Sequence, residues 1–354
     1  MRLKNWILIF AILNIAFVSV ALAVEKENKP TYNFTKKGLV KSSETESYVV
    51  LKPELIFKGK YEFSTESGEG RFNLKNSRVG VRGNLNKFFS YRFLLDLNSE
   101  GKFSVLDLYG KIQASNRLSI TFGQQGLSLF NPYTIDPKTL DYANRPFVGK
   151  YIFSSRDMGI AVAYKLKKEG FPIDLEAGVY NGDGINNPKW TKTPSYGGRL
   201  AFGSYTKGFR FTTKAYRNKV SNEQDFLAYG ADIRITHENF RFETEFMSKH
   251  NYFNKEKLTT ALAQGLYSFP LESKVFSAVQ TALRWDAMGY DFVNKGFGVN
   301  RGTIGLNFIL RSDSFYSLIR LNYEHYFKSK VVLPEFKNGY ADDNKISLEL
   351  LFCF

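Results

Sequence analysis

Residues 346–354, ISLELLFCF, end the chain as a run in which apolar side chains alternate with small or polar ones, and the last residue is aromatic. Alternate side chains of an extended strand point to the same side. One face of this segment therefore carries only Ile346, Leu348, Leu350, Phe352 and Phe354. Exposing such a face to water at a frayed terminus is unfavourable, whereas contact with lipid is favourable. The ending predicts a strand with one side in a bilayer, as in a transmembrane β-barrel.

The first residues have the pattern of a secretory signal peptide. Arg2 and Lys4 precede an apolar run at residues 6–20, and Ala21 and Ala23 are small residues at the cleavage positions. The run is shorter than the ~20 residues that a transmembrane helix needs, so we expect cleavage. We divide the chain into a signal peptide (1–23), a charged periplasmic lead without regular structure (24–45) and a transmembrane β-barrel (46–354). Export predicts residence in the bacterial outer membrane.

Composition agrees with a barrel. Phe accounts for 33 of the 354 residues and aromatic residues for 16%, yet the mean hydropathy is slightly negative, because apolar and polar residues alternate. The single cysteine, Cys353, allows no internal disulfide and lies far from the position at which a lipoprotein carries its lipid. A net charge of +15 on an exported chain points to anionic lipid headgroups and small anionic solutes as partners, and not to nucleic acid.

Amphipathic segments of ~10 residues, joined alternately by short turns and longer loops, follow from Tyr48 onward. In one of them Leu227 and Tyr229 share a face, and Asp232 and Arg234 share the other. Such a charged face suits the lumen of a barrel. We predict an all-β fold, a sixteen-stranded antiparallel transmembrane β-barrel wide enough for water. The expected strands are residues 47–63, 71–84, 88–98, 104–115, 117–123, 157–168, 172–180, 196–204, 209–218, 227–237, 239–249, 258–268, 274–286, 299–311, 315–327 and 344–354.

The longest connection, residues 124–156, is rich in aromatic residues such as Tyr133, Tyr142 and Phe147. Connections of this length are usually functional or disordered, and the aromatic residues favour a packed loop. We expect it to be the third loop, folded inward so that it narrows the lumen. The alternative is an extracellular loop.

Several short motifs resemble those of one porin family in their order and spacing. They are residues 78–83 (RVGVRG), 88–92 (FFSYR), 106–109 (LDLY), 117–118 (RL), 123–124 (GQ), 155–160 (SRDMGI), 180–182 (YNG) and 198–200 (GRL). Over about residues 72–200 this set resembles the phosphate-selective porin O and P family, and the remainder resembles a generic barrel. The resemblance implies a homotrimeric sixteen-stranded porin with an inward third loop and lumen arginines that guide anions.

The chain departs from that family in two places. Residues 123–128, GQQGLS, lack the lysine of the corresponding family segment, and Pro132 is displaced. Asn144 and Arg145 stand where the family has an acidic residue and an arginine. Both differences are compatible with a porin but remove part of the basis for phosphate selectivity.

Basic side chains are the candidates for guiding solutes, because guanidinium groups stay charged and offer a planar fork to oxyanions. We expect Arg82, Arg92 and Arg117 to lie near the constriction. Acidic residues share the same strand phase, so the alternative is a charge ladder that pairs across strands and only solvates the wall. An Arg156–Asp157 pair would likewise only anchor the loop. The pore and anion-binding candidates are Arg78, Arg82, Arg92, Arg117, Lys138, Arg145, Lys150, Arg156 and Arg199.

Enzymatic and metal-binding functions find little support. The three histidines lack metal-ligand spacing, and no Gly-x-Ser-x-Gly motif is present. Residues 181–187, NGDGINN, carry oxygen ligands for calcium but lack the spacing of a calcium loop, which favours a turn-rich extracellular loop. Aromatic residues near strand ends favour interfacial girdles over a sugar-binding slide. We expect no enzyme, no metal and no cofactor.

The sequence thus predicts an outer-membrane porin for passive diffusion of small hydrophilic solutes, with a preference for anions such as phosphate. Two alternatives remain. A pore whose charges cancel would show no ion selectivity. A plugged barrel would act as an adhesin or receptor and would not conduct.

Overall fold

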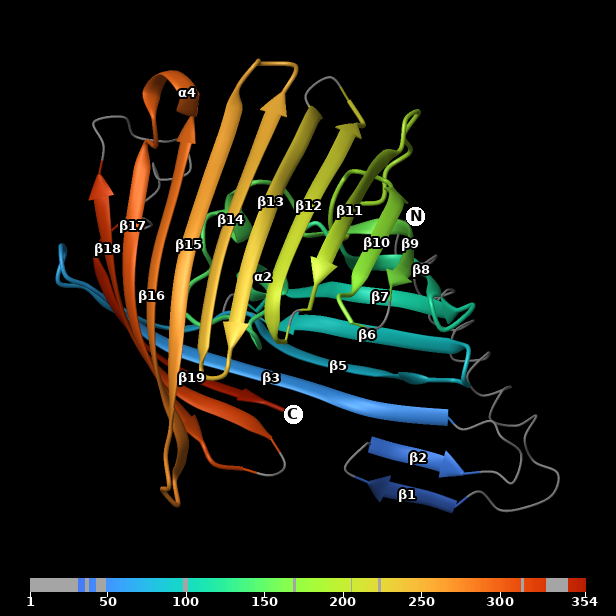
Figure 1. Ribbon diagram of the computed structural model, residues 1–354, viewed down its shortest axis with the longest axis horizontal. Coiled ribbons are helices and arrows are strands. Elements are labelled where there is room, and N and C mark those ends of the chain that lie inside the picture. The colour runs from blue at the N-terminus through green and yellow to red at the C-terminus, as the bar shows by residue number, and fades with distance from the viewer. Residues whose placement is uncertain are drawn as a thin grey trace.

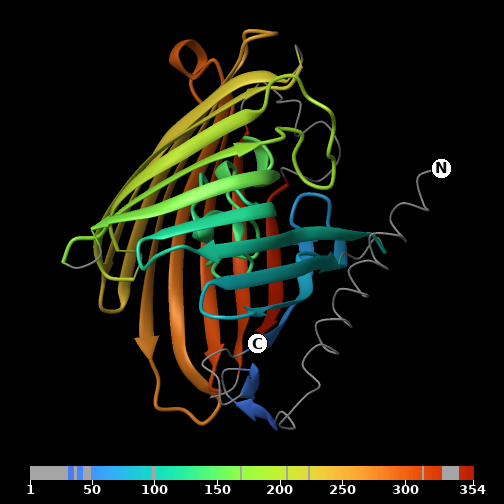
Figure 2. The same cartoon turned by 90° about the vertical axis from the view of Figure 1, so that its right-hand side faces the viewer.

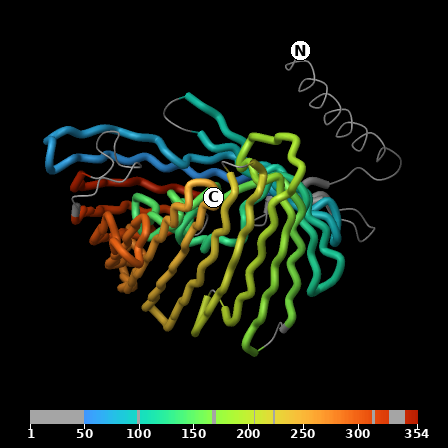
Figure 3. Tube along the Cα trace, turned by 90° about the horizontal axis from the view of Figure 1, so that it is seen from above, coloured from blue at the N-terminus to red at the C-terminus, as the bar shows by residue number. Residues whose placement is uncertain are grey.

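The computed structural model describes residues 31–35, 38–42, 49–97, 101–167, 170–204, 206–221, 224–312, 315–328 and 343–354, so the predicted signal peptide lies outside the described residues. Neighbouring strands of the wall are antiparallel and follow chain order from β5 to β19 (Figure 1). The last strand, β19 (Lys345–Cys353), pairs with β3 (Val49–Ser64) and closes the sheet into a barrel. Figure 3 shows these two strands side by side, in red and blue.

The other wall strands run up and down between β3 and β19. They are β4 (Gly70–Leu74), β5 (Ser77–Asn84), β6 (Phe89–Leu97), β7 (Phe103–Gln113), β8 (Leu118–Gly126), β9 (Arg156–Lys167), β10 (Ile173–Tyr180), β11 (Ser195–Gly203), β12 (Gly208–Lys219), β13 (Asp225–His237), β14 (Phe240–Asn251), β15 (Lys257–Pro270), β16 (Phe276–Tyr290), β17 (Val299–Leu310) and β18 (Tyr316–Lys328). Within the described residues, three short helices lie in connections: α2 (Pro132–Ile135), α3 (Val148–Tyr151) and α4 (Phe292–Lys295). None of the described helices is long and apolar enough to cross a membrane.

β4 and β5 form one strand of the barrel, because both pair with β3. Tyr61 of β3 opposes Phe72 of β4, and Leu55 opposes Val79 of β5. The break between them holds Asn76 at φ 62°, a left-handed conformation that interrupts the ladder. With β4 and β5 taken together the barrel has sixteen strands, and each coincides with one of the predicted strands. The predicted fold class is confirmed.

The alternation that predicted the strands separates the outer face of the wall from the inner face. On β19, Leu348 and Leu350 are 50% and 46% exposed, whereas Ser347 and Glu349 are 0% and 1% exposed. Exposed apolar side chains beside buried charged ones are the inverse of a water-soluble sheet and suit a wall between lipid and a polar interior. The C-terminal strand is oriented as predicted, and Phe354 is half exposed at its end.

Two short strands precede the barrel. β1 (Thr31–Thr35) and β2 (Gly38–Ser42) form an antiparallel hairpin, and β2 pairs with the start of β3 through Val40 opposite Val50. Figure 1 shows the hairpin below β3. These strands lie within the lead that the sequence predicted to lack regular structure, so part of that lead is a sheet extension of the barrel.

Candidate solute pathway in the barrel lumen

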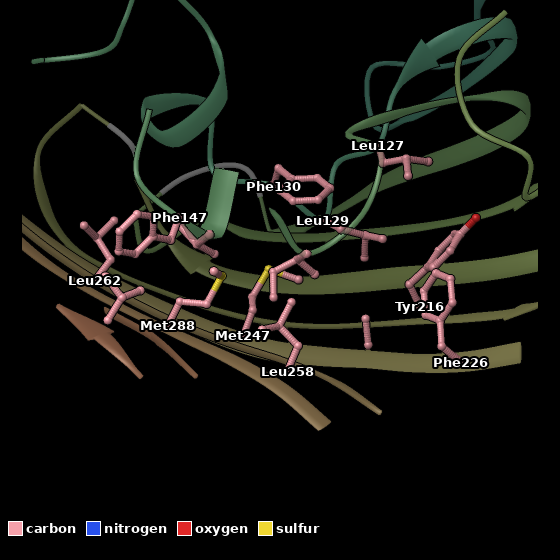
Figure 4. Packing of buried hydrophobic residues seen from close by; sticks show 14 of the residues in the cluster. Leu127, Leu129, Phe130, Phe147, Tyr216, Phe226, Met247, Leu258, Leu262 and Met288 are labelled. Atoms are coloured by element: carbon pink, nitrogen blue, oxygen red, sulfur yellow. The ribbon is translucent and has the colours of Figure 1, made fainter. Parts of the chain in front are cut away.

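The connection between β8 and β9, residues 127–155, packs against the inner face of the wall, and we call it the β8–β9 segment. Its Phe130 and Phe147 join a buried apolar cluster with residues of β12 to β16 (Figure 4). In that cluster Met247 is 1% exposed, whereas its outward neighbour Phe246 is 41% exposed. Figure 2 shows the segment in green, with β6 and β7 in front of it and orange strands behind. The segment is therefore held on the lumen side of the wall.

Cations of the wall bind the backbone of this segment. The wall donors and segment carbonyl acceptors are Arg320 and Leu140 (2.6 Å), Lys58 and Ala143 (2.7 Å), Arg284 and Asn144 (2.9 Å), and Arg301 and Arg145 (2.9 Å). Hydrogen bonds with a charged donor are stronger than neutral ones. Because four such bonds fall within residues 140–145, that stretch is fixed to β3, β16, β17 and β18.

The same cations pair with buried carboxylates on neighbouring strands. Arg301 lies 2.7 Å from Asp286 and 3.3 Å from Glu324, and these side chains are at most 4% exposed. Arg320 lies 2.6 Å from Glu349. Burying a cation is tolerated only with such partners. On this side of the lumen the charges form a paired ladder that also anchors the β8–β9 segment, so they are not available to solutes.

A recess of about 280 Å³ opens on the other side of the lumen, along β6 to β10. Its polar lining includes Arg92, Asp107, Lys111, Arg156 and Glu176. Among the described residues Arg92 and Arg156 both pair with Asp107, whereas Lys111 forms no ion pair. This side of the lumen therefore presents cations that are not fully neutralised.

Arginines in and beside the recess outnumber their carboxylate partners. Arg82 and Arg92 share Glu54, with Nε to carboxylate distances of 3.3 and 2.8 Å. Arg92 also lies 2.9 Å from Asp107, which lies 2.8 Å from Arg156. Three arginines thus share two carboxylates, and the Arg82 side chain is 45% exposed. The surplus positive charge faces the lumen.

A second basic group lies where the β8–β9 segment meets β5. Arg78 is 2% exposed and lies 3.4 Å from Asp136 of the segment. Arg145 donates to the side-chain oxygen of Asn76 at 3.2 Å and has no carboxylate partner in the described part of the chain. Burial and the nearby Arg156 lower the pKa of Arg145 to about 10. It therefore remains charged at neutral pH.

Lys138 and Lys150 are exposed side chains of the same segment. The ammonium of Lys150 lies 4.6 Å from the centroid of the Tyr151 ring. Partial loss of hydration, followed by the nearby cations Arg301 and Lys75, lowers the pKa of Lys150 to about 8. Its charge is therefore sensitive to pH just above neutrality.

Two further candidate residues, Arg199 and Arg117, lie in different parts of the barrel. Arg199 lies on the inner face of β11, 3.3 Å from Glu176 of β10. Arg117 was expected near the constriction, and this is wrong: it is exposed at the turn before β8. β8 has nine residues, so at ~3.3 Å per residue Arg117 lies about 30 Å from the start of the β8–β9 segment.

Comparison with known proteins identifies the architecture. No family model and no curated protein matches the sequence. The outer membrane channel DcaP of Acinetobacter baumannii is similar in structure, with 12% identity, 88% of this chain and 99% of that chain covered, and a TM-score of 0.60. An anion-selective porin from Comamonas acidovorans is 12% identical, with 86% of this chain and 100% of that chain covered and a TM-score of 0.59. The trimer form of OmpT of Vibrio cholerae is 10% identical, with 86% of this chain and 99% of that chain covered and a TM-score of 0.58. The fold is that of outer-membrane porins.

The apolar outer wall and the closed hydrogen-bonded sheet agree with a location in a membrane. A closed barrel pairs all its strand edges, which is what a chain needs in order to cross lipid with strands. With its porin fold and exposed apolar belt, this chain is a protein of the bacterial outer membrane. The resemblance to the phosphate-selective family remains a prediction.

Sequence reasoning missed the residues that fix the loop between β10 and β11. Gln124 accepts from the Asn186 backbone N–H at 2.8 Å and donates to the Asn186 side chain at 3.0 Å. Asp157 accepts from the Gly182 N–H at 2.8 Å, and Arg156 pairs with Asp107 instead, so the Arg156–Asp157 alternative is wrong. The partners of these contacts are backbone groups and amides distant in sequence, which leave no motif.

The same contacts bear on residues 181–187. Within the described ranges no group of three or more His, Cys, Asp or Glu side chains could hold a metal ion. Hydrogen bonds fix the loop to the wall: Gln124 and Asp157 accept from the Asn186 and Gly182 N–H groups, and Asn218 donates to the Gly182 carbonyl. The contacts are those of a turn-rich loop packed on the barrel, which is the interpretation that the sequence favoured.

Proposed function

We propose that this chain is an outer-membrane porin through which small hydrophilic solutes diffuse passively, with a preference for anions. The observation that carries the proposal is the excess of positive charge on the side of the lumen that the wall ladder leaves open. The basic side chains there are Arg78, Arg82, Arg92, Lys111, Lys138, Arg145, Arg156, Lys165 and Arg199. The acidic ones are Glu54, Asp96, Asp107, Asp136, Asp174 and Glu176. A positive potential raises the local concentration of anions.

In this proposal the β8–β9 segment is the constriction loop. Its anchoring at residues 140–145 holds Arg145 beside Asn76 and Arg156, next to the recess. In this proposal a solute that passes along the recess meets Arg82 and Arg92 of the wall and Arg145 of the segment. Guanidinium groups form charge-assisted hydrogen bonds with oxyanions, so arginines that outnumber their carboxylates suit a passing anion.

The proposal has three further parts. The trimer form of the OmpT neighbour supports a homotrimer. The Comamonas neighbour, described as an anion-selective porin, is compatible with passage of anions, of which phosphate is the one to test. Residues 1–23 are proposed to be a signal peptide and 24–45 a periplasmic lead. No catalytic step, metal or cofactor is part of the proposal.

The test is single-channel conductance in a planar bilayer under a potassium chloride gradient, repeated with phosphate added. We expect open channels, a zero-current potential that indicates chloride preference, and a current reduced by phosphate. Open channels without ion preference would refute the anion selectivity but leave a porin. Folded protein that forms no channels would refute the porin function and favour the plugged barrel.

A further inference from the structure

The outer wall is hollowed across β10 to β12. Ala177, Gly198 and Ala215 oppose one another on these three strands and lie on the outer face of the wall. Two adjoining hollows of about 720 and 590 Å³ both include these three residues in their lining. Large exposed side chains flank them, including Tyr196 at 57% and Tyr229 at 37% exposure. The lipid-facing wall of a barrel is usually covered by large side chains. The small residues Ala177, Gly198 and Ala215 therefore leave a narrow apolar groove, which we call the furrow.

A row of basic side chains adjoins the furrow on the same outer face. Arg217 opposes Leu227, Leu227 opposes His250, and His250 opposes Lys257 on β12 to β15. The row lies near the ends of β12 and β14 and the starts of β13 and β15, which is the end of the barrel opposite the tight turn between β13 and β14. Arg217 itself lines the larger hollow, so furrow and row are continuous.

The row keeps positive charge available. Arg217 pairs with Asp225 at 2.5 Å, donates to the backbone carbonyls of Asn218 and Phe226 (the latter at 3.0 Å), and stacks 4.7 Å from the Tyr252 ring centroid. Within the described ranges neither His250 nor Lys257 has a carboxylate partner. One carboxylate therefore faces three basic groups at the boundary of the apolar wall.

We propose that this surface binds a phosphorylated lipid of the outer leaflet. One acyl chain lies over Ala177, Gly198 and Ala215, and the phosphate contacts Arg217, His250 and Lys257. Basic side chains at the edge of an apolar surface recognise anionic headgroups by charge. The apolar wall of a second copy would match the furrow but not the basic row, whereas a phosphorylated lipid supplies both an apolar chain and a negative charge. The inference rests on the outer-membrane placement in the proposed function.

The experiment is native mass spectrometry of the full chain, folded in detergent and titrated with lipid A carrying two phosphates or with its dephosphorylated form. The charge variant is Arg217→Gln/His250→Gln/Lys257→Gln, and the furrow variant is Ala215→Leu. We expect the charge variant to weaken binding of the phosphorylated lipid about tenfold or more, since each basic residue strengthens binding to an anionic surface several-fold. Ala215→Leu should weaken binding of both lipids, because it fills the furrow.

Matched controls remove charge or add volume elsewhere. The triple variant Lys87→Gln/Lys207→Gln/Lys274→Gln neutralises three lysines at turns of the opposite end, and Ala261→Leu enlarges an outward side chain beyond the hollows. Both should bind lipid as the unmodified chain does. Heat-modified mobility on gels verifies that every variant is folded.

Three results would overturn the proposal. They are equal binding of the two lipid forms, unchanged binding by the charge variant, and an oligomer that Ala215→Leu disrupts while lipid binding persists, which would assign the furrow to a second copy. Conductance of the same variants separates this proposal from the porin function. Loss of lipid binding with normal conductance concerns the furrow alone, and absent conductance with normal lipid binding concerns the porin function alone.

Discussion

Neutralising Arg82 and Lys111 should reduce the anion preference of the pore without altering its shape. Arg82 shares Glu54 with Arg92, so its removal leaves that carboxylate with one partner and takes away the surplus charge. Lys111 lines the recess and forms no ion pair among the described residues. Neither side chain donates to the β8–β9 segment in the contacts that anchor it. The double variant Arg82→Gln/Lys111→Gln therefore changes the field in the lumen and keeps the anchors.

The size of the effect follows from Coulomb's law. A unit charge about 8 Å from a permeating ion in water contributes about 0.5 kcal/mol, which screening at ~0.1 M salt reduces to about 0.25 kcal/mol. Anion and cation are affected in opposite directions, so each neutralised charge lowers the chloride to potassium permeability ratio about twofold. The double variant should therefore lower the ratio about fourfold. The reverse change, Glu54→Gln, removes a negative charge at the same place and should raise the ratio about twofold.

The assay is the zero-current potential of purified protein in a planar bilayer under a potassium chloride gradient. Lys87→Gln/Lys207→Gln, at exposed turns, is the matched control and should leave the potential within error of the unmodified chain. Raising the salt concentration should shrink every difference, because screening increases. If the double variant and Glu54→Gln both leave the potential unchanged while the channels stay open, the lumen charges do not set selectivity and the reasoning is refuted.

The remaining predictions concern the anchors, pH and the outer face. Arg320→Met, which leaves Glu349 with Lys58 as its remaining cation and frees the Leu140 carbonyl, should lower the free energy of unfolding by about 1–3 kcal/mol and raise conductance; unchanged urea unfolding and conductance would contradict the anchor. Raising the pH from 7 to 9 discharges Lys150, whose pKa is about 8, and should lower the anion preference in reversal-potential measurements, a change that Lys150→Gln abolishes. Leu350→Lys, on the exposed face of β19, should destabilise the barrel in bilayers by about 2–4 kcal/mol if that residue lies near the bilayer midplane, as unfolding from vesicles would measure.

The wall was predictable because its signal is local. A strand between lipid and lumen must alternate along its own length, so ten residues suffice to recognise it, as Leu348 and Glu349 show. The predicted strand at residues 71–84 is divided into β4 and β5 by Asn76, whose left-handed backbone conformation cannot be recognised from the alternation of apolar and polar residues. Arg117 was misplaced because it lies at the turn that begins β8, whereas the β8–β9 segment follows the other end of that strand.

The use of each lumen cation was not predictable. Arg82 and Arg320 alternate with apolar neighbours in the same way and both lie near a glutamate, yet the Arg82 side chain is 45% exposed and the Arg320 side chain is 1% exposed. What separates them is the Leu140 carbonyl of the β8–β9 segment, which binds Arg320. Backbone carbonyls carry no sequence signature, so a pattern of basic residues cannot distinguish an anchor from a solute contact.

The anchored segment therefore determines which charges a solute meets. Arg284, Arg301 and Arg320 each hold a carboxylate as well as a segment carbonyl, so displacing the segment would uncover pairs rather than free cations. Selectivity then depends on the difference between cations and carboxylates on the open side, and not on the number of arginines in the barrel. This is why an anchor variant should enlarge the pore and dilute its anion preference, whereas exchanging the single carboxylate Glu54 should strengthen that preference while the pore keeps its size.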